Sequence, residues 1–396
     1  MQQSDLSFSD TKSAFSHLND TALRKSKFIF KIFTFPFLVK YGPGLASFAL
    51  KAGLPVKGLI KTTVFNHFCG GETIDDCDQA VKNLWASKVG SILDYSVEGD
   101  DSEANFDANL EEIKHTIEKA KGNPQYPFCV FKTTGIARFA LLEKLDAGTK
   151  LDHDELDEYY KFRNRFEKIC EKAAENKVRL FVDAEETWIQ KTVDGLVHEM
   201  MAKYNREEAI IFNTVQLYRK GMIAFIQKCI DDAKANNYHL GFKMVRGAYM
   251  EKESARAQSL NLPNPIQNSK ADTDRDYNQA LHLCFQNREI ISLCAGTHNE
   301  DSCKILAQLL NENGVSNNDT RFWFAQLYGM SDNISFNLAR NGYNVAKYLP
   351  YGPVKAVMPY LGRRAKENSS VSGQMGRELS LIMEEVKRRG KEKRST

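Results

Sequence analysis

Short apolar runs recur along most of the chain, and each is separated from the next by a longer, charge-rich amphipathic segment. Continuous hydrophobicity is typical of parallel strands buried on both faces, and the intervening segments are long enough for helices. Eight strands alternating with helices predict an α/β fold of the (βα)8 TIM-barrel type. A doubly wound sheet is the weaker alternative, because no GxGxxG motif follows any strand. The runs occupy residues 89–95, 128–133, 178–183, 209–216, 240–245, 290–297, 322–327 and 343–348.

The pattern before and after these runs predicts three parts: an N-terminal helical arm at 1–87, a barrel at 88–370, and a basic C-terminal helix or tail at 371–396. The polar residues 1–21 predict a loosely held start. Residues 22–68 mix lysines with phenylalanines, and Gly42-Pro43-Gly44 predicts a break between short helices. The arm either packs on the main domain or contacts a membrane surface with its basic and aromatic side chains.

Composition narrows the classes of protein further. A formal charge of +3 at 396 residues gives no general case for nucleic-acid binding. The eight cysteines include no CxxC pair, which predicts reduced thiols in a cytosolic-type compartment. The N-terminus has no apolar signal segment, its composition argues against a mitochondrial presequence, and no uncharged run is long enough to span a bilayer. We therefore expect a protein that is neither secreted nor transmembrane.

Motifs for metal or serine chemistry are missing from the sequence. There is no HExxH, EF-hand loop or Cys/His cluster, and Asp152-His153-Asp154-Glu155 lacks the glycine turn of a calcium loop. No GxSxG nucleophile motif is present either. We therefore expect neither a metal nor a serine nucleophile.

Polar side chains stand at the end of each predicted strand, where barrel enzymes place their active sites. Small residues directly after the fifth strand allow a ligand to approach the backbone. This arrangement suits a flat cofactor with polar edges. The residues are Tyr95, Ser96 and Glu98; Lys132, Thr133 and Thr134; Asp183 and Glu185; Gln216 and Tyr218; Lys243, Arg246, Gly247, Ala248 and Tyr249; Thr297, His298 and Asn299; Gln326; and Tyr348.

The segment after the eighth strand carries a cluster of charged side chains. Pro350, Gly352 and Pro353 are expected to end the strand and open a helix. In that helix a tyrosine, two arginines and a glutamate fall at i, i+3, i+4 and i+7 and share one face: Tyr360, Arg363, Arg364 and Glu367. Two adjacent guanidinium groups suit a carboxylate or phosphate, although a solvated helix with an internal ion pair is the alternative.

Several of these segments, in this order, resemble the proline dehydrogenase family, and in particular its eukaryotic-type branch of single-function enzymes. They read VDAEETW, IFNTVQLY, KMVRGAYMEKE, AGTHNED, FAQLYGM and YLPYGPVKAVMPYLGRRAKEN. The resemblance implies a distorted (βα)8 barrel that holds FAD at the carboxyl ends of its strands. It also implies oxidation of L-proline to Δ1-pyrroline-5-carboxylate, the first step of proline catabolism, by hydride transfer from proline C5 to FAD N5.

The resemblance assigns roles by position. The implied proline contacts are Lys132, Asp183, Met244, Tyr249, Tyr348, Tyr360, Arg363 and Arg364, and Glu98 matches an acid that pairs with the first arginine and gates the site. The implied FAD contacts are Gln216, Lys243, Val245, Gly247, Ala248, Thr297, His298, Asn299, Gln326 and Glu367. The implied electron acceptor is a membrane quinone, which favours a protein of the bacterial cytoplasm, peripheral to the inner membrane, or of the mitochondrial inner membrane if the chain is eukaryotic. The basic tail either offers attraction to an anionic membrane surface or is a solvated terminal helix.

Two other enzymatic readings stay open. A hydroxyproline dehydrogenase shares the arginine helix, although Tyr348 matches the proline enzymes and would crowd a ring hydroxyl. A flavin-free barrel lyase would use Lys132 to form a Schiff base with a carbonyl substrate. A third reading is a membrane-surface or metabolite-binding protein without turnover.

Overall fold

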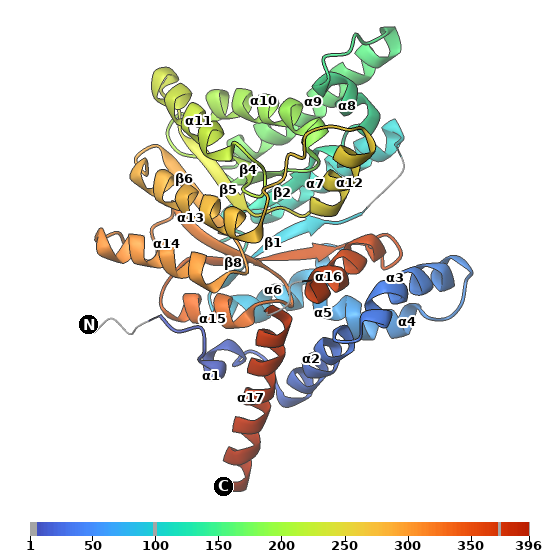
Figure 1. Cartoon of the computed structure of the whole chain (residues 1–396), viewed down its shortest axis with the longest axis vertical. Helices are drawn as coiled ribbons and strands as arrows, with labels where there is room; N and C mark the ends of the chain where they lie inside the picture. The colour runs from blue at the N-terminus through green and yellow to red at the C-terminus, as the bar shows by residue number, and fades with distance from the viewer. Residues whose placement is uncertain (1–5, 98–100, 371–373, 396) are drawn as a thin grey trace. The chain divides into compact units, whose positions relative to one another are not determined.

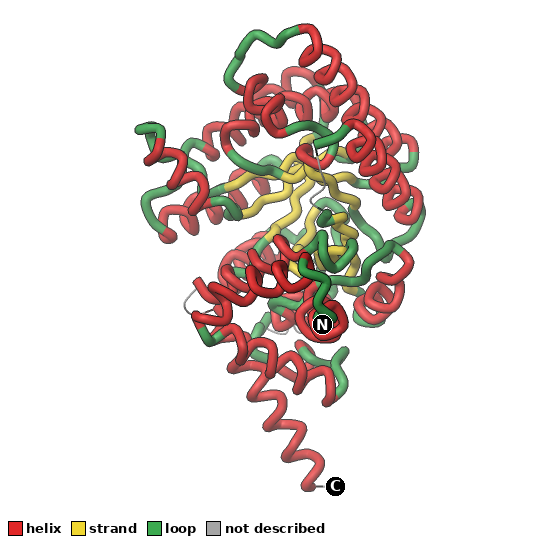
Figure 2. Tube along the Cα trace, turned by 90° about the vertical axis from the view of Figure 1, so that its right-hand side faces the viewer, coloured by secondary structure: helices red, strands yellow, loops and turns green. Residues whose placement is uncertain are grey.

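A computed structural model of the chain describes residues 6–97, 101–370 and 374–395. Its strands are β1 (Val89–Tyr95), β2 (Cys129–Lys132), β3 (Leu180–Asp183), β4 (Ile211–Gln216), β5 (Leu240–Val245), β6 (Ile291–Gly296), β7 (Phe322–Leu327) and β8 (Val345–Tyr351). Within these ranges they form one eight-stranded sheet in the order β1-β8-β7-β6-β5-β4-β3-β2, with helices between consecutive strands (Figure 1, Figure 2). The predicted distorted (βα)8 barrel is confirmed.

The eighth strand differs from its predicted end. We expected Pro350 to stop the strand, but β8 continues to Tyr351, which pairs in register with Tyr95 of β1. Proline removes a backbone donor but keeps its acceptor. The carbonyl oxygen of Pro350 accepts a hydrogen bond from the Gly70 N–H at 2.8 Å, so the strand passes through the proline.

The chain divides into two compact units. Unit 2, residues 99–325, holds strands β2 to β6 and most of β7. Its helices are α7 (Glu103–Ala120), α8 (Phe139–Asp146), α9 (His153–Glu175), α10 (Thr187–Tyr204), α11 (Met222–Asn236), α12 (Met250–Ser259), α13 (Lys270–Gln286) and α14 (Glu300–Glu312).

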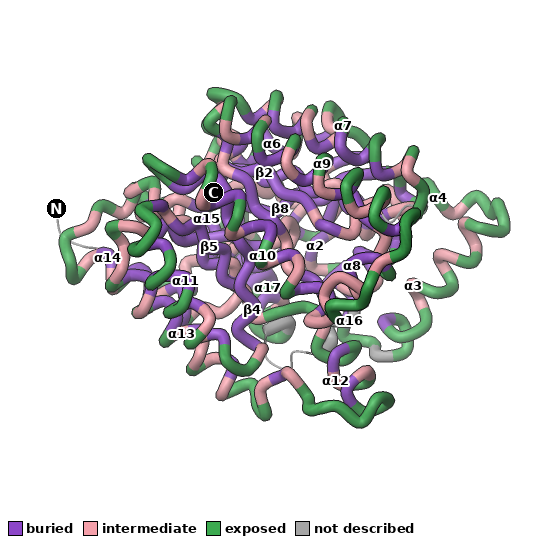
Figure 3. The backbone as a smooth tube through the Cα atoms, turned by 90° about the horizontal axis from the view of Figure 1, so that it is seen from above, coloured by how far each residue is buried: buried purple, intermediate pink, exposed green. Residues whose placement is uncertain are grey.

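The strands of unit 2 are buried along their length, and Figure 3 shows β2, β4 and β5 as buried segments. Three phenylalanine rings pack together near the start of strands β2, β3 and β4. The ring centroids are 4.2 Å apart for Phe128 and Phe181 and 5.5 Å apart for Phe181 and Phe212. The apolar side chains fill the interior of the sheet, so the polar side chains gather at the carboxyl ends of the strands.

Unit 1, residues 1–98 and 326–396, contains β1, β8 and both terminal segments. Its helices are α1 (Thr11–Ala14), α2 (Asp20–Phe33), α3 (Pro36–Lys51), α4 (Lys57–Ile60), α5 (Asn66–Phe68), α6 (Asp78–Trp85), α15 (Asp332–Arg340), α16 (Met358–Ser370) and α17 (Gln374–Ser395). Helix α16 is the helix that carries the two arginines, and it follows β8 as predicted.

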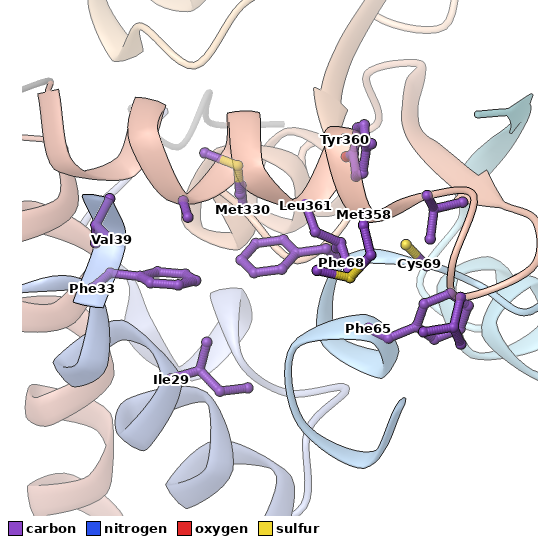
Figure 4. Packing of buried hydrophobic residues seen from close by; sticks show 13 residues of the cluster. Ile29, Phe33, Val39, Phe65, Phe68, Cys69, Met330, Met358, Tyr360 and Leu361 are labelled. Atoms are coloured by element: carbon purple, nitrogen blue, oxygen red, sulfur yellow. The ribbon is translucent and has the colours of Figure 1, made fainter. Parts of the chain in front are cut away.

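Helices α2, α3 and α5 pack against α16 in one apolar cluster. Figure 4 shows Ile29, Phe33 and Val39 of the arm in this cluster with Leu361 of α16. The predicted break at residues 42–44 is wrong, because α3 runs through Pro43 without interruption. Burial of apolar side chains against α16 outweighs the one hydrogen bond that an internal proline costs.

Residues 6–21 are not loosely held, as we had expected. Phe8 and Phe15 are 2% and 1% exposed, and His17 stacks on Phe336 of α15 with ring centroids 3.8 Å apart. The side-chain amide of Asn333 also donates to the carbonyl oxygen of Phe8. A few buried rings are enough to order a segment whose overall composition is polar.

The C-terminal segment forms helix α17, which packs on α1 and α2 through Leu381 and Ile382. Among the described ranges, no helix combines the length and the apolar character needed to cross a bilayer. The predicted domain boundaries at 87/88 and 370/371 stay a proposal.

Candidate active site

Three of the predicted residues, Lys132, Asp183 and Lys243, lie near the carboxyl ends of β2, β3 and β5 in unit 2. Lys132 and Asp183 are register partners on adjacent parallel strands. The Lys243 ammonium donates to Oδ1 of Asp183 and lies 5.3 Å from the centroid of the Phe181 ring. Lys243 is only 4% exposed, so its charge has been removed from water and needs this carboxylate. Asp183 thus neutralises a buried cation at the edge where the sequence predicted a ligand.

Glu185, two residues beyond Asp183, is a second buried carboxyl group. It accepts hydrogen bonds from the backbone N–H and the hydroxyl of Thr134, at 3.0 and 2.6 Å. Burial raises the pKa of Glu185 to about 7. Glu185 and Thr134 were predicted as strand-end residues, but no role was predicted for either. The sequence could have predicted this contact, because the threonine and the glutamate follow adjacent strands.

Gln216, at the end of β4, carries an acceptor that the protein does not satisfy. Its Nε2 donates to the carbonyl oxygen of Glu185 at 2.9 Å. Its Oε1 is buried and has no hydrogen-bond partner among the described residues. Buried acceptors are almost always paired, so this oxygen is suited to a ligand donor.

Arg246 organises the turn between β6 and α14, although the sequence analysis gave it no role. Its guanidinium donates to Asp274 at 2.7 Å, to Thr297 Oγ1 at 2.7 Å and to Ser302 Oγ at 3.0 Å. Thr297 Oγ1 also accepts from the Asn299 N–H at 3.1 Å, and Asn299 caps the N-terminus of α14. The turn that contains half-buried His298 is therefore held at both ends.

The backbone is accessible directly after β5, where Gly247 and Ala248 are exposed. Gly247 has φ +138°, and a side chain there would come within 2.5 Å of the Tyr218 ring, so only glycine fits. Tyr249 follows as the residue that opens α12, Val245 is half-buried, and Met244 is fully buried within β5.

Unit 1 contains the arginine helix and the end of β8. Arg364 is 7% exposed, and its guanidinium carbon lies 5.1 Å from the centroid of the Tyr360 ring, one turn earlier on α16. Arg363 is half-buried. Tyr348, on β8, is 8% exposed. Tyr360 and Arg364 therefore share a face of α16, as their spacing predicted.

Of the remaining predicted residues of unit 1, the structure describes Gln326 but not Glu98 or the side chain of Glu367. Gln326 is buried, and its Oε1 accepts from the Ser335 hydroxyl at 2.8 Å. Glu98 and the side chain of Glu367 lie outside the described residues. That the residues of the two units hold one substrate stays a prediction.

Comparison with known proteins places the chain in a family. A family model described as proline dehydrogenase matches residues 77–377. The carbapenem antibiotics biosynthesis protein CarD of Pectobacterium carotovorum subsp. carotovorum is 34% identical over 87% of this chain and 90% of its own length. Proline dehydrogenase 1, mitochondrial, of Arabidopsis thaliana is 31% identical over 84% of this chain and 76% of its own length.

A solved structure shares the fold. Proline utilization A from Bdellovibrio bacteriovorus, inactivated by N-propargylglycine, superposes with a TM-score of 0.71 at 17% identity. The match covers 93% of this chain but only 40% of that protein, so the likeness is to one part of a longer chain. The resemblance read from the motifs is confirmed by the family model, and the chain belongs to the proline dehydrogenase family.

Proposed function

We propose that this protein oxidises L-proline to Δ1-pyrroline-5-carboxylate with FAD as cofactor and a membrane quinone as the final electron acceptor. The observation that carries the proposal is the family match, which spans residues 77–377 and so includes both the strand ends and the arginine helix. Both sets include buried or half-buried cations, of the kind that suits a carboxylate, and this supports the proposal.

Proline is a small zwitterion, and its carboxylate must exchange water for protein partners. Arg363, Arg364 and Lys132 are the cations that we assign to it. Lys243 is not counted with them, because Asp183 already neutralises it. The rings of Tyr249, Tyr348 and Tyr360, with Met244, would pack against the apolar ring of the substrate. If the carboxylate is fixed at one end, C5 at the opposite end of the ring is oriented for reaction.

The residues at the ends of β4, β5 and β6 fit the polar edge of a flavin. Gln216 offers a buried acceptor without a partner in the described residues, and the exposed backbone at Gly247 and Ala248 permits close approach. Lys243 and the Thr297–Asn299 turn add donors. FAD bound there would supply the chemistry that side chains lack, namely acceptance at N5 of the hydride that leaves proline C5. The remaining proposed contacts are Val245, His298, Gln326 and Glu367, and Glu98 is proposed to gate the site.

The nitrogen of proline must lose a proton before hydride can leave C5, because the lone pair forms the new C=N bond. We therefore expect the rate to rise toward alkaline pH, with water as the simplest proton acceptor. Both oxygens of Glu185 are engaged by Thr134, so we do not assign Glu185 as the base.

Reoxidation by a quinone implies a location at a membrane that contains one. We propose a peripheral position on the bacterial inner membrane, or on the mitochondrial inner membrane if the chain is eukaryotic. The name of the Arabidopsis relative, which includes "mitochondrial", supports the second placement for a eukaryotic chain.

A visible absorption spectrum of the purified protein tests the proposal. We expect flavin bands that bleach when L-proline is added, because a reduced flavin absorbs little visible light. Turnover of trans-4-hydroxyproline in preference to proline would identify a hydroxyproline dehydrogenase instead. A colourless protein in which borohydride traps a carbonyl substrate on Lys132 would replace the proposal with a Schiff-base lyase.

A further inference from the structure

Large hydrophobic side chains lie exposed along one short segment of the arm. On α3, Phe37, Tyr41, Leu45 and Phe48 are 66%, 47%, 63% and 69% exposed. Their spacing of four, four and three residues places them on one helical face, and the rings of Phe37 and Tyr41 are 5.0 Å apart. We call this set the arm surface, and it also includes Phe28, Phe35, Leu38, Leu54 and Leu59, each between 46% and 67% exposed.

The opposite face of α3 is already occupied. Val39, Ala46 and Leu50 pack with the cluster that holds α16. Helix α3 is therefore apolar on two faces, one covered within unit 1 and the other uncovered in the described structure. Soluble monomers rarely gather large exposed apolar side chains on one helical face without a partner.

The charge around the arm surface indicates what that partner is. Residues 21–71 contain eight basic residues and no acidic residue. Lys31, Lys40 and Lys51 are exposed within or beside the arm surface. Side chains that combine exposed aromatic rings with lysines are typical of proteins that lie on an anionic lipid surface.

The C-terminal tail, which the sequence suggested for the same purpose, has its charges engaged elsewhere. Arg388 and Arg389 each form ion pairs with Glu385, and Lys393 pairs with Asp20. These contacts reduce the charge that the tail can offer to a lipid surface. Residues 21–71 contain no acidic residue, although Lys57 and Lys61 pair with Glu72 just beyond them.

We propose that the arm surface docks on an anionic lipid bilayer, with the rings of α3 at the boundary between headgroups and acyl chains and the lysines at the headgroups. A second copy of the chain is the less suitable occupant, because it would bring like charges together. The purpose of docking, delivery of electrons to a membrane quinone, rests on the proposed function. The docking itself rests only on the exposed side chains and their charge.

Vesicle binding by the full-length protein tests this proposal. We expect binding to vesicles of phosphatidylglycerol and phosphatidylcholine that exceeds binding to phosphatidylcholine alone. The double variant Phe37→Gln with Phe48→Gln should bind about tenfold more weakly, because two rings no longer enter an apolar medium. The matched control is Leu156→Gln with Tyr160→Gln, which removes exposed apolar side chains from α9 and should bind as the wild type does.

A second pair of variants tests the charge. Lys40→Gln with Lys51→Gln should remove most of the preference for anionic vesicles, and Lys150→Gln with Lys228→Gln, which changes exposed lysines of unit 2, should keep it. Wild-type protein that ignores anionic vesicles would overturn the proposal. So would equal losses in the arm and control variants.

Two further measurements separate membrane docking from the proposed function and from self-association. Proline-dependent reduction of a water-soluble dye should be unchanged in the Phe37 and Phe48 variant. If the protein reduces the dye but does not bind vesicles, the docking proposal is wrong and the proposed function stands. If it binds vesicles but does not reduce the dye, only the proposed function is rejected. Sedimentation velocity tests whether the partner is a second copy of the chain. That partner would be identified if the wild type is a dimer, the Phe37 and Phe48 variant is a monomer, and neither binds vesicles.

Discussion

The ion pair between Lys243 and Asp183 decides how much positive charge the strand ends present. A buried ammonium without a partner would be strongly unfavourable, and the pair also leaves Asp183 less available as a counter-charge for other cations. Lys132 is the register partner of Asp183 and is half-buried at the same edge, and we propose it as a cation for the substrate carboxylate. The distribution of charge at this edge therefore depends in part on a contact between strands β3 and β5.

Arg364→Met tests the proposed carboxylate site. Methionine retains apolar contact with the Tyr360 ring but loses charged hydrogen bonds of roughly 1.5–3 kcal/mol, so kcat/KM for proline should fall about 10- to 150-fold. Steady-state kinetics measure this loss, and the visible spectrum should show flavin still bound. Arg340→Met, at an arginine 65% exposed, is the control and should leave kcat/KM unchanged. Unaltered kinetics in Arg364→Met would contradict the assigned role.

Glu185 should make the stability of the protein depend on pH near neutrality. The ordinary pKa of a glutamate is 4.5, and burial raises the pKa of Glu185 to about 7. Between these pH values the folded protein keeps a proton that the unfolded chain has lost. The free energy of unfolding therefore falls as pH rises from about 4.5 to about 7, by an amount on the order of 3 kcal/mol.

Glu185→Gln tests this dependence. The glutamine can still accept from the Thr134 N–H but carries no charge, so the slope between pH 5 and pH 7 should become shallower. Urea unfolding of both proteins at several pH values measures it. Part of the slope should remain, because burial also raises the pKa of Glu378 to about 8. Identical slopes in the two proteins would show that Glu185 is ionised in the folded state at neutral pH.

At the scale of whole elements, the N-terminal arm supports the helix that carries the arginines. Helices α2 and α3 contribute Phe33 and Val39 to a cluster with Leu361 of α16 (Figure 4). Ala365 of α16 belongs to the same cluster. The buried face of α16 lies against the arm, which leaves the position of Arg363 and Arg364 dependent on residues more than 300 positions earlier in the chain. The arm is thus a structural part of the proposed site and not an accessory.

Phe33→Ala tests the support of α16 by the arm. Loss of this ring, 5% exposed, should lower the free energy of unfolding by about 3–5 kcal/mol, because transfer and cavity costs add. Phe35→Ala removes a ring that is 52% exposed and should cost far less. Denaturant titration compares the two midpoints. Similar losses in both variants would argue against a packed arm.

At the scale of the whole molecule, all eight cysteines are buried and free, and their reduced state stays a prediction. Burial raises the pKa of Cys129, Cys229 and Cys294 to about 12. A thiol reacts as its thiolate, so both access and ionisation are suppressed in the folded protein.

Titration with Ellman's reagent measures this protection. We expect almost no reactive thiol in the native protein at neutral pH and all eight after unfolding in guanidinium chloride. Rapid labelling of one or more cysteines under native conditions would mean that a part of the core opens readily.

The sequence alone predicted the number and order of the strands, and β1, β5 and β7 have the predicted bounds. It also supported the family through motifs at the strand ends. Both kinds of signal are local, because hydrophobic periodicity records burial and a motif is read from neighbouring residues. Within α16, the spacing of Tyr360 and Arg364 was sufficient to predict a shared face, since a helix repeats regularly.

Only the tertiary structure decided which distant residues meet. Lys243 and Asp183 are 60 residues apart and pair because β3, β4 and β5 are neighbours in one sheet. Glu185 acquires its raised pKa from burial that its polar neighbours in sequence do not reveal. Pro43 lies within a continuous helix because α3 packs on α16, and Phe8 and Phe15 order a polar segment. Local patterns record the preferences of each segment, but the free energy of packing and desolvation depends on partners that the fold alone brings together.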